Sequence, residues 1–178
     1  VPYKTLRFMV WQCTNYTTQK HFTDRPLPVH QQTDEGKGVS LENLTLLCIL
    51  SGKEGWYCVP HTATDDYIAQ MAKLVGTNYP KDRPLYVEFS NEVWNGIFPC
   101  HKALLTEAIA NTELDGGDQY QRLYQHVAWK LRKVVVEFKK YHPNVVGVLA
   151  GQAVNPWLAE QGLDFLKRKY GSAEYVVG

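Results

Sequence analysis

The chain has 178 residues, a formal net charge of +1 and 44% hydrophobic residues. This length is enough for one domain with a sizeable core. The near-neutral charge and the lack of a dense Lys/Arg patch argue against a nucleic-acid-binding role, and no apolar run reaches the ~18 residues that a membrane span requires.

The first predicted strand covers residues 4–11, where apolar side chains occupy every second position from Leu6 to Val10. Arg7 lies early on this strand, and we interpret it as a member of a buried structural ion pair. Residues 13–38 are polar and aperiodic, which predicts a long loop. Loops of this length in a compact domain are usually functional or poorly ordered.

The following segments alternate between helix and strand. Residues 39–50 carry leucines at helical spacing behind an N-capping serine, which predicts a helix. Residues 56–60 form a short predicted strand that is rich in aromatic and β-branched side chains. Either Thr62 or Thr64 can cap the next helix, whose apolar stripe extends to about residue 76.

The most informative stretch is a predicted strand at residues 85–90 that ends in a polar cluster. Its nearly continuous apolar run predicts burial on both faces, as in a parallel sheet covered by helices. Asn91, Glu92 and Trp94 follow at the carboxyl end of this strand. A carboxyl group that moves a proton, an amide that holds a hydroxyl and an indole that forms a flat apolar wall are what a sugar site requires.

The second half of the chain continues the same alternation. The predicted helices lie near residues 101–110, from 118 to 142 and after Pro156, and the predicted strands lie at 145–150 and 173–177. This order predicts a single α/β domain whose parallel strands are joined by right-handed helical crossovers.

The run from Tyr86 to Asn95, Tyr-Val-Glu-Phe-Ser-Asn-Glu-Val-Trp-Asn, resembles a cellulase-like branch of the superfamily of retaining glycoside hydrolases on (β/α)8 barrels. In that superfamily an Asn-Glu pair ends the fourth barrel strand. Residues 56–61, with their Pro-His ending, are similar to the third strand of the branch, and residues 148–152 look like its fifth. The alternative interpretation of the run is a buried strand followed by an ordinary polar loop.

The resemblance implies a partial (β/α)8 TIM barrel with parallel strands corresponding to about strands two to six. A complete barrel takes about 250 residues, and this sequence does not begin with Met. We therefore expect residues 1–178 to be a single incomplete barrel domain of the catalytic type, and a fragment of a longer chain.

The resemblance assigns Glu92 as the general acid/base, with Asn91 and Trp94 binding the substrate. The family nucleophile is a glutamate on the seventh strand, which this sequence does not reach, so no residue here takes that role. Glu88 lies roughly 13 Å from Glu92 along the strand. Because retaining enzymes separate their carboxyl groups by only about 5 Å, Glu88 is not expected to be the partner.

Three further residues are candidates for lining the sugar site. His61 follows the third-strand segment, and a structural histidine is the equal alternative. Gln152 and Asn155 follow the fifth-strand segment, where a plain polar loop is the equal alternative. No CxxC pair is present, so we expect no metal site, and nothing in the sequence calls for a cofactor.

The cysteines and glycosylation sequons favour an extracellular or secretory location. Asn15 and Asn43 each begin an Asn-X-Thr sequon. The candidates for disulfide formation are Cys13, Cys48, Cys58 and Cys100. Pairing of Cys58 with Cys100 and of Cys13 with Cys48 is one of three possible arrangements. Sequons also arise by chance, and cysteines are often simply buried apolar residues.

Two classes of function remain open at this point. The first is a retaining glycoside hydrolase acting on a β-linked polysaccharide. The second is a non-catalytic carbohydrate-binding or extracellular matrix module on the same scaffold. In both, the expected partner is a glycan, together with the rest of the chain or a larger extracellular assembly, and neither involves a nucleic acid.

Overall fold

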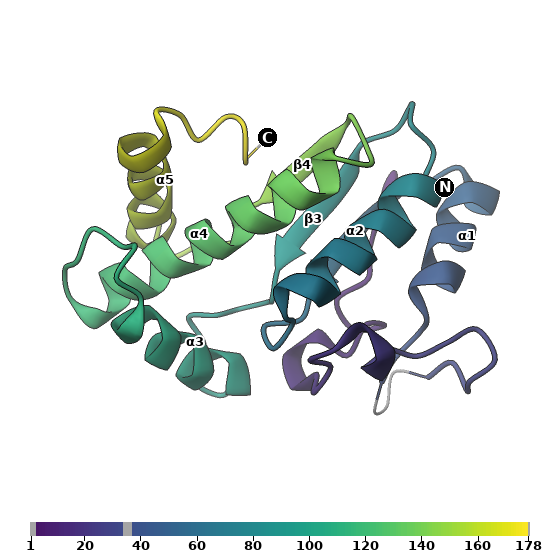
Figure 1. Cartoon of the computed structure of the whole chain (residues 1–178), viewed down its shortest axis with the longest axis horizontal. Helices are drawn as coiled ribbons and strands as arrows, with labels where there is room; N and C mark the ends of the chain where they lie inside the picture. Colours follow the sequence, from purple (N-terminus) through teal and green to yellow (C-terminus); the bar gives the residue numbers. More distant parts are fainter. Residues whose placement is uncertain (1–2, 34–36, 178) are drawn as a thin grey trace.

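The computed structural model describes residues 3–33 and 37–177. Within them, four parallel strands form one sheet in the order β1-β2-β3-β4, which is also their order along the chain (Figure 1). The strands are β1 Thr5–Arg7, β2 Glu54–Val59, β3 Leu85–Phe89 and β4 Val145–Val148. The predicted α/β class and the parallel pairing of these strands are therefore confirmed.

Helices separate the strands along the chain. They are α1 Leu41–Ser51, α2 Asp65–Asn78, α3 Pro99–Ala110, α4 Gln119–Lys139 and α5 Trp157–Tyr170, with short 3-10 helices η1 Thr14–Tyr16 and η2 Phe22–Asp24. Contacts join α1 to β2, and α4 to β3 and β4, while α2 lies between α1 and α4 (Figure 1). These three helices therefore cover one face of the sheet.

The opposite face of the sheet carries polar and aromatic side chains. Register places neighbouring side chains of the four strands in rows across this face, the first with Arg7, Trp56, Tyr86 and Val146 and the next with Cys58, Glu88 and Val148. We call it the polar face. Alternate residues such as Tyr57, Leu85 and Val87 are fully buried and join the core under the helices. The predicted burial of β3 on both faces is confirmed apart from Tyr86, which is partly exposed, but α1, α2 and α4 cover only one of those faces.

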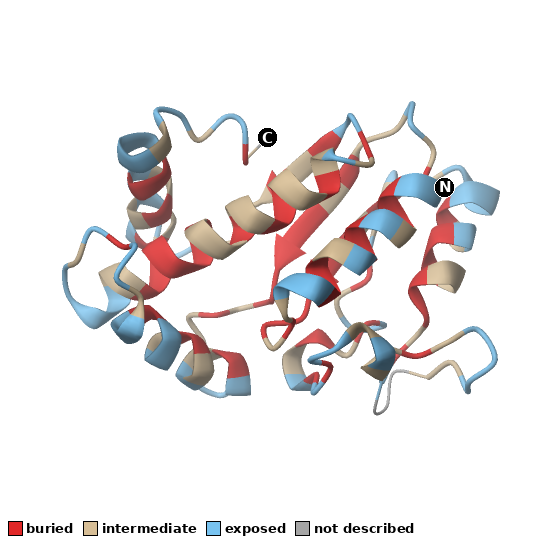
Figure 2. Ribbon diagram, viewed as in Figure 1, coloured by how far each residue is buried: buried red, intermediate tan, exposed pale blue. Residues whose placement is uncertain are grey.

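The longest helix, α4, packs one continuous stripe against the sheet. Leu123, Leu131 and Phe138 of this helix are fully buried, at the three- and four-residue steps that define one helical face. In Figure 2, α2 and α4 alternate between buried and more exposed residues along their length, as one-sided packing requires. Burying each large side chain of this kind contributes about 1.5–3 kcal/mol.

Three predicted helix starts are confirmed by their capping hydrogen bonds. The side chains of Ser40, Thr64 and Asp118 accept bonds from backbone N–H groups in the first turns of α1, α2 and α4. Asp118 and Gln121 form a reciprocal capping box. These bonds satisfy donors that a helix start leaves without intrahelical partners.

The first strand is shorter than predicted. It ends at Arg7 because the chain then turns, with Gln12 N donating to Phe8 O at 2.8 Å. The Gln12 side chain takes over the pairing that a longer strand would supply. Its Nε2 donates to Cys58 O at 3.0 Å, and its Oε1 accepts from Cys58 N at 2.8 Å. A side chain thus replaces β1 beside the end of β2.

The fifth predicted strand, at residues 173–177, is wrong. Val177 forms only an isolated parallel bridge to Gly147. The N–H groups of Val176 and Val177 both donate to Ala173 O at 2.9 Å, which closes a turn and leaves this backbone unavailable for a ladder. The sheet therefore has four strands among the described residues rather than five.

No helix in the described ranges is long and apolar enough to span a membrane.

Candidate functional site

The carboxyl end of β3 has an unusual backbone. Ser90 has a φ of 64° and Glu92 a φ of 41°, both in the left-handed region. Non-glycine residues in such conformations cost about 1–3 kcal/mol each and concentrate at functional sites. Ser90 N donates to Val59 O at 2.8 Å, and Asn95 N donates to Glu92 O at 2.9 Å. These bonds hold the strained turn and fix where Asn91 and Glu92 lie.

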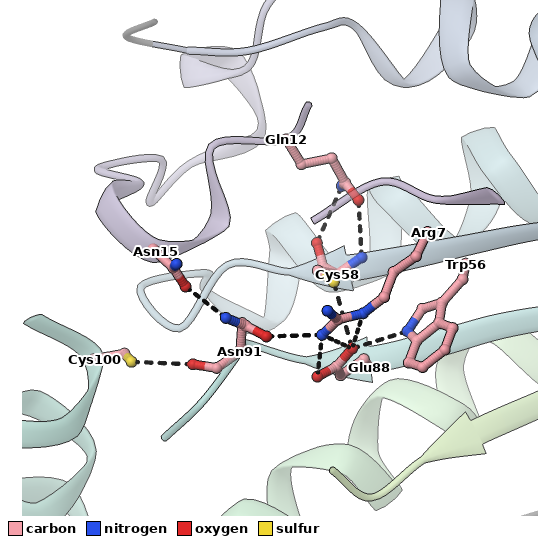
Figure 3. Close-up of polar contacts among 8 residues, drawn as sticks. All are labelled: Arg7, Gln12, Asn15, Trp56, Cys58, Glu88, Asn91 and Cys100. Atoms are coloured by element: carbon pink, nitrogen blue, oxygen red, sulfur yellow. Dashed lines mark hydrogen bonds and ion pairs between the residues drawn. The ribbon is translucent and has the colours of Figure 1, made fainter. Parts of the chain in front are cut away.

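Arg7 binds two residues of this segment at once (Figure 3). Its Nη2 donates to Glu88 Oε1 at 2.9 Å and Oε2 at 2.8 Å, and its Nε reaches Oε2 at 3.2 Å. The same Nη2 donates to Asn91 Oδ1 at 2.7 Å. The guanidinium also lies over the Trp56 ring, 4.8 Å from its centroid. The predicted ion pair of Arg7 is confirmed, although its side chain remains 34% exposed, and its bond to Asn91 was not anticipated.

Glu88 is the anchor of this network and is not free to act on a ligand. Its side chain is 1% exposed, and it also accepts from Trp56 Nε1 at 2.9 Å and Cys58 Sγ at 3.6 Å. Burial raises the pKa of Glu88, while the hydrogen bonds and charge of Arg7 oppose that rise. The carboxylate therefore positions Arg7.

The side chain of Asn91 is held at both ends. It is 4% exposed, and besides accepting from Arg7 it donates through Nδ2 to Asn15 Oδ1 at 2.8 Å (Figure 3). Its backbone oxygen accepts from Cys100 Sγ at 3.5 Å. These partners fix the amide orientation, with the oxygen toward Arg7. The second Nδ2 hydrogen has no partner among the described residues, so it can donate to a ligand hydroxyl.

Glu92 presents one carboxylate oxygen without a protein partner in the described chain. Its Oε2 accepts from Asn95 Nδ2 at 3.1 Å, and no hydrogen bond involves Oε1. The side chain is half-buried and lines a cavity of about 10 Å³ with Asn91, Trp94 and Val148. A cavity of this size holds about one water molecule. Glu92 is therefore accessible and hydrogen-bonded on one side only.

His61 lies in the turn after β2 and is 5% exposed. Its Nδ1 is buried without a hydrogen-bond partner, and burial lowers its pKa, so the ring is neutral at pH 7. No hydrogen bond links it to Glu92 or Asn91 in the described ranges. The structure thus leaves His61 outside the Arg7–Asn91 network.

Trp94, Gln152 and Asn155 do come together. They line a second hollow, of about 250 Å³, next to the cavity of Glu92. Gln152 and Asn155 face each other across a tight turn, because Asn155 N donates to Gln152 O at 2.8 Å. The other residues that line this hollow are Tyr120, Tyr124, Trp157 and Leu158.

The sequence did not single out the two tyrosines as site residues. Their spacing matches the inner stripe of α4, which is a core signal. Only the contact between α4 and α5 brings this end of the stripe beside the turn after β4.

The predicted disulfides are wrong. Cys48, Cys58 and Cys100 carry free thiols and are fully buried, so neither predicted pair is formed. The thiol of Cys58 points to Glu88 and that of Cys100 to a backbone oxygen, which directs them to different partners. Burial raises the pKa of all three thiols, that of Cys48 to about 11. These cysteines behave as buried apolar residues.

The two sequon asparagines differ in position. Asn15 lies in η1, and its side chain accepts the bond from Asn91. Asn43 lies in the first turn of α1, and its Nδ2 donates to Gln32 Oε1 at 3.0 Å. A glycan on Asn15 would stand beside Asn91, so glycosylation of Asn15 and ligand binding at Asn91 exclude each other.

In the described part of the chain, no cluster of three or more His, Cys, Asp or Glu side chains is arranged to hold a metal ion.

Comparisons with models of protein families, with curated proteins and with solved structures found no match to this chain. The distinguishing feature of this chain is its parallel sheet. At the carboxyl ends of the strands, the sheet carries a fixed amide, a half-buried glutamate and an aromatic hollow. Any functional assignment therefore rests on the chemistry of this edge.

Proposed function

We propose that this chain carries the acid/base half of a retaining glycoside hydrolase that acts on a β-linked polysaccharide. The observation that supports it most is the pair Asn91–Glu92 on a strained strand end, with the amide of Asn91 held by Arg7. The left-handed backbone at Ser90 and Glu92 brings a fixed amide and a carboxyl group to the same edge of the sheet.

The arrangement of the strands is consistent with part of a (β/α)8 barrel. The four strands are parallel and ordered as in the chain, and helices cover one face. A barrel would place the polar face with Arg7 and Glu88 on the inside, and would give β1 and β4 the neighbours that sheet edges otherwise lack. We propose that these strands correspond to barrel strands two to five.

In the proposed reaction Glu92 donates its proton to the leaving glycosidic oxygen. A carboxylate from a segment outside this sequence attacks the anomeric carbon, and Glu92 then removes a proton from the water that releases the sugar. Glu88 cannot supply the attacking carboxylate because Arg7 and Trp56 occupy its oxygens. The free Nδ2 hydrogen of Asn91 would hold the hydroxyl next to the anomeric carbon.

The non-catalytic alternative is favoured by a different observation. The hollow that joins Trp94 to Gln152 and Asn155 has about 250 Å³, whereas the cavity beside Glu92 has about 10 Å³. A carbohydrate-binding or matrix module would use the large hollow and make no demand on Glu92. We also propose an extracellular location, now supported by the sequons alone.

Hydrolysis of soluble β-glucan and β-xylan distinguishes the hydrolase from the non-catalytic module. It is measured for the intact natural protein and for its Glu92→Gln variant. This substitution keeps the shape of the side chain and removes the acid, so it should lower the rate by about 100- to 10,000-fold. Glu174→Gln is the matched control, since Glu174 is exposed and its carboxylate has no partner in the described chain. Wild-type rates for Glu92→Gln would contradict the assignment, and an intact protein that binds but never cleaves would establish the alternative.

A further inference from the structure

The hollow beside the Glu92 cavity is built from three segments far apart in the sequence. Trp94 follows β3, and Tyr120 and Tyr124 lie at the start of α4. Gln152 lies in the connection after β4, and Trp157 is the first residue of α5. Figure 1 shows the start of α4 lying beside α5. The hollow is therefore a product of the tertiary fold.

Aromatic rings form the walls of this hollow. Tyr120 is 47% exposed and Trp157 37% exposed, and Trp94 is half-buried. No charged side chain lines it. Exposed aromatic rings without charges suit the flat apolar C–H face of a neutral ring, and they exclude phosphates and carboxylates as preferred ligands.

Tyr124 supplies an unused hydrogen-bonding group. The residue is fully buried, and its hydroxyl has no hydrogen-bond partner in the described chain. Buried hydroxyls in folded proteins are nearly always satisfied, so each exception needs an explanation. Tyr124 lines the hollow, but its hydroxyl has no exposed surface, so a ligand hydroxyl reaches it only when the side chains that cover it move on binding.

Two side-chain amides supply the remaining polar groups in the lining of the hollow. The side chains of Gln152 and Asn155 form no hydrogen bonds with other described residues, although the tight turn fixes their backbones. Neutral amides donate and accept at the same site, which matches a ring that carries several hydroxyl groups. The volume of about 250 Å³ lies below the roughly 300–1,000 Å³ of pockets for drug-sized ligands, so the hollow suits a single ring.

We propose that this hollow is a subsite for one neutral pyranose residue with all-equatorial hydroxyls, such as glucose or xylose, in a β-linked chain. Such rings present a flat face to the aromatic walls and hydroxyls at their rim to Gln152 and Asn155. Trp94 lines both this hollow and the Glu92 cavity. The subsite is therefore next to the reacting position, and in this respect it rests on the proposed function.

Calorimetric titration of the intact protein with cellotetraose and xylotetraose tests the subsite. Trp157→Ala should weaken binding by about tenfold or more, as loss of an aromatic anchor does. Tyr124→Phe should weaken it by up to about tenfold through one lost hydrogen bond, and it should leave the melting temperature unchanged or raise it. A satisfied structural hydroxyl would give the opposite change in stability.

Matched variants make the result specific. Tyr175→Ala removes an aromatic side chain that is 51% exposed outside the hollow, and it should leave binding unchanged. The α-linked maltotetraose should bind about tenfold more weakly, because its bent chain cannot keep a flat ring face on the aromatic walls. Lack of saturable binding of either β-linked oligosaccharide would overturn the inference. So would affinities of the Trp157→Ala and Tyr124→Phe variants that both equal that of the wild type.

The same measurements separate this inference from the proposed function. Glu92→Gln should lose hydrolysis and keep oligosaccharide binding. If hydrolysis depends on Glu92 while the variants at Trp157 and Tyr124 bind normally, the subsite is wrong and the function stands. If the Glu92 variant cleaves normally while binding still depends on Trp157, the function is wrong and the subsite stands.

Discussion

Arg7 and Asn91, which lie 84 residues apart in the sequence, are joined by a hydrogen bond of 2.7 Å from Nη2 to Oδ1. The same nitrogen holds both oxygens of Glu88, so the ion pair on the polar face fixes the amide at the strand end. The geometry of the candidate site is thus set by the first strand of the sheet, and Arg7 acts as a positioning residue.

Replacing Arg7 should therefore damage stability and site geometry together. Removing one partner of a buried ion pair costs about 3–5 kcal/mol. Because Arg7 is 34% exposed and Glu88 only 1%, solvent reduces the cost of Arg7→Met to about 2–3 kcal/mol. Urea denaturation measures it.

The matched control for this variant is Arg168→Met. Arg168 pairs with Asp115, and their side chains are 55% and 37% exposed, so its loss should change the unfolding free energy by less than about 0.5 kcal/mol. Equal effects of the two substitutions would contradict the anchoring role of Arg7.

The core beneath α4 predicts a large cost for Leu131→Ala. Leu131 is fully buried against the sheet, and truncating such a leucine costs about 2–5 kcal/mol. Leu50→Ala is the control, since Leu50 is 76% exposed in α1, and it should shift stability by less than about 0.5 kcal/mol. Similar denaturation midpoints for the two variants would mean that this face of α4 is not packed as described.

Gly147 should not tolerate a side chain. A Cβ atom at this position would lie 2.0 Å from Val176 O and 2.7 Å from Val135 Cγ2. Gly147→Ala should therefore cost about 1–3 kcal/mol through overpacking and displace the segment after α5 from β4. At Gly96 a Cβ would meet nothing closer than 3.9 Å, so Gly96→Ala should be nearly neutral, and thermal melting of both variants tests the contrast.

A pH dependence follows from Glu107. Its hydrogen bond from His126, aided by Lys130, lowers its pKa to about 2, against an ordinary value of 4.5. A lowered pKa stabilises the fold above about pH 4.5, and that contribution disappears as the pH falls toward 2. The side chain is 43% exposed, so the effect should be about 1 kcal/mol or less.

Unfolding free energies between pH 2 and 6 should show this decrease in the wild type and a shallower one in Glu107→Gln. The Glu174→Gln variant should follow the wild-type curve. If Glu107→Gln and wild type run parallel through this range, the bond from His126 does not stabilise the carboxylate.

The helices and their starts were predictable because the evidence for them is local. The caps at Ser40, Thr64 and Asp118 depend on a few adjacent residues. The strand predicted at residues 173–177 failed for the converse reason. Its β-forming composition is outweighed by the turn at Ala173, whose oxygen accepts two N–H groups, and composition alone does not reveal that turn.

The candidate site was predictable only where the sequence carried its own context. Asn91, Glu92 and Trp94 are consecutive or nearly so, and they lie at the strand end as expected. The bond from Arg7 to Asn91 depends on strand register, and the role of Tyr124 depends on how α4 meets α5. Neither relationship has a signature in local spacing, so neither could be predicted from the sequence.

The measurement that tests the central claim most directly is azide rescue of Glu92→Ala in the intact protein, with an aryl β-glycoside as substrate. An activated leaving group needs little protonation, so a retaining enzyme without its acid/base still forms the glycosyl-enzyme but releases it slowly. Azide, which needs no general base, should restore turnover and yield the β-glycosyl azide. Absence of rescue, or an α-glycosyl azide product, would contradict the assignment of Glu92 as the acid/base of a retaining hydrolase.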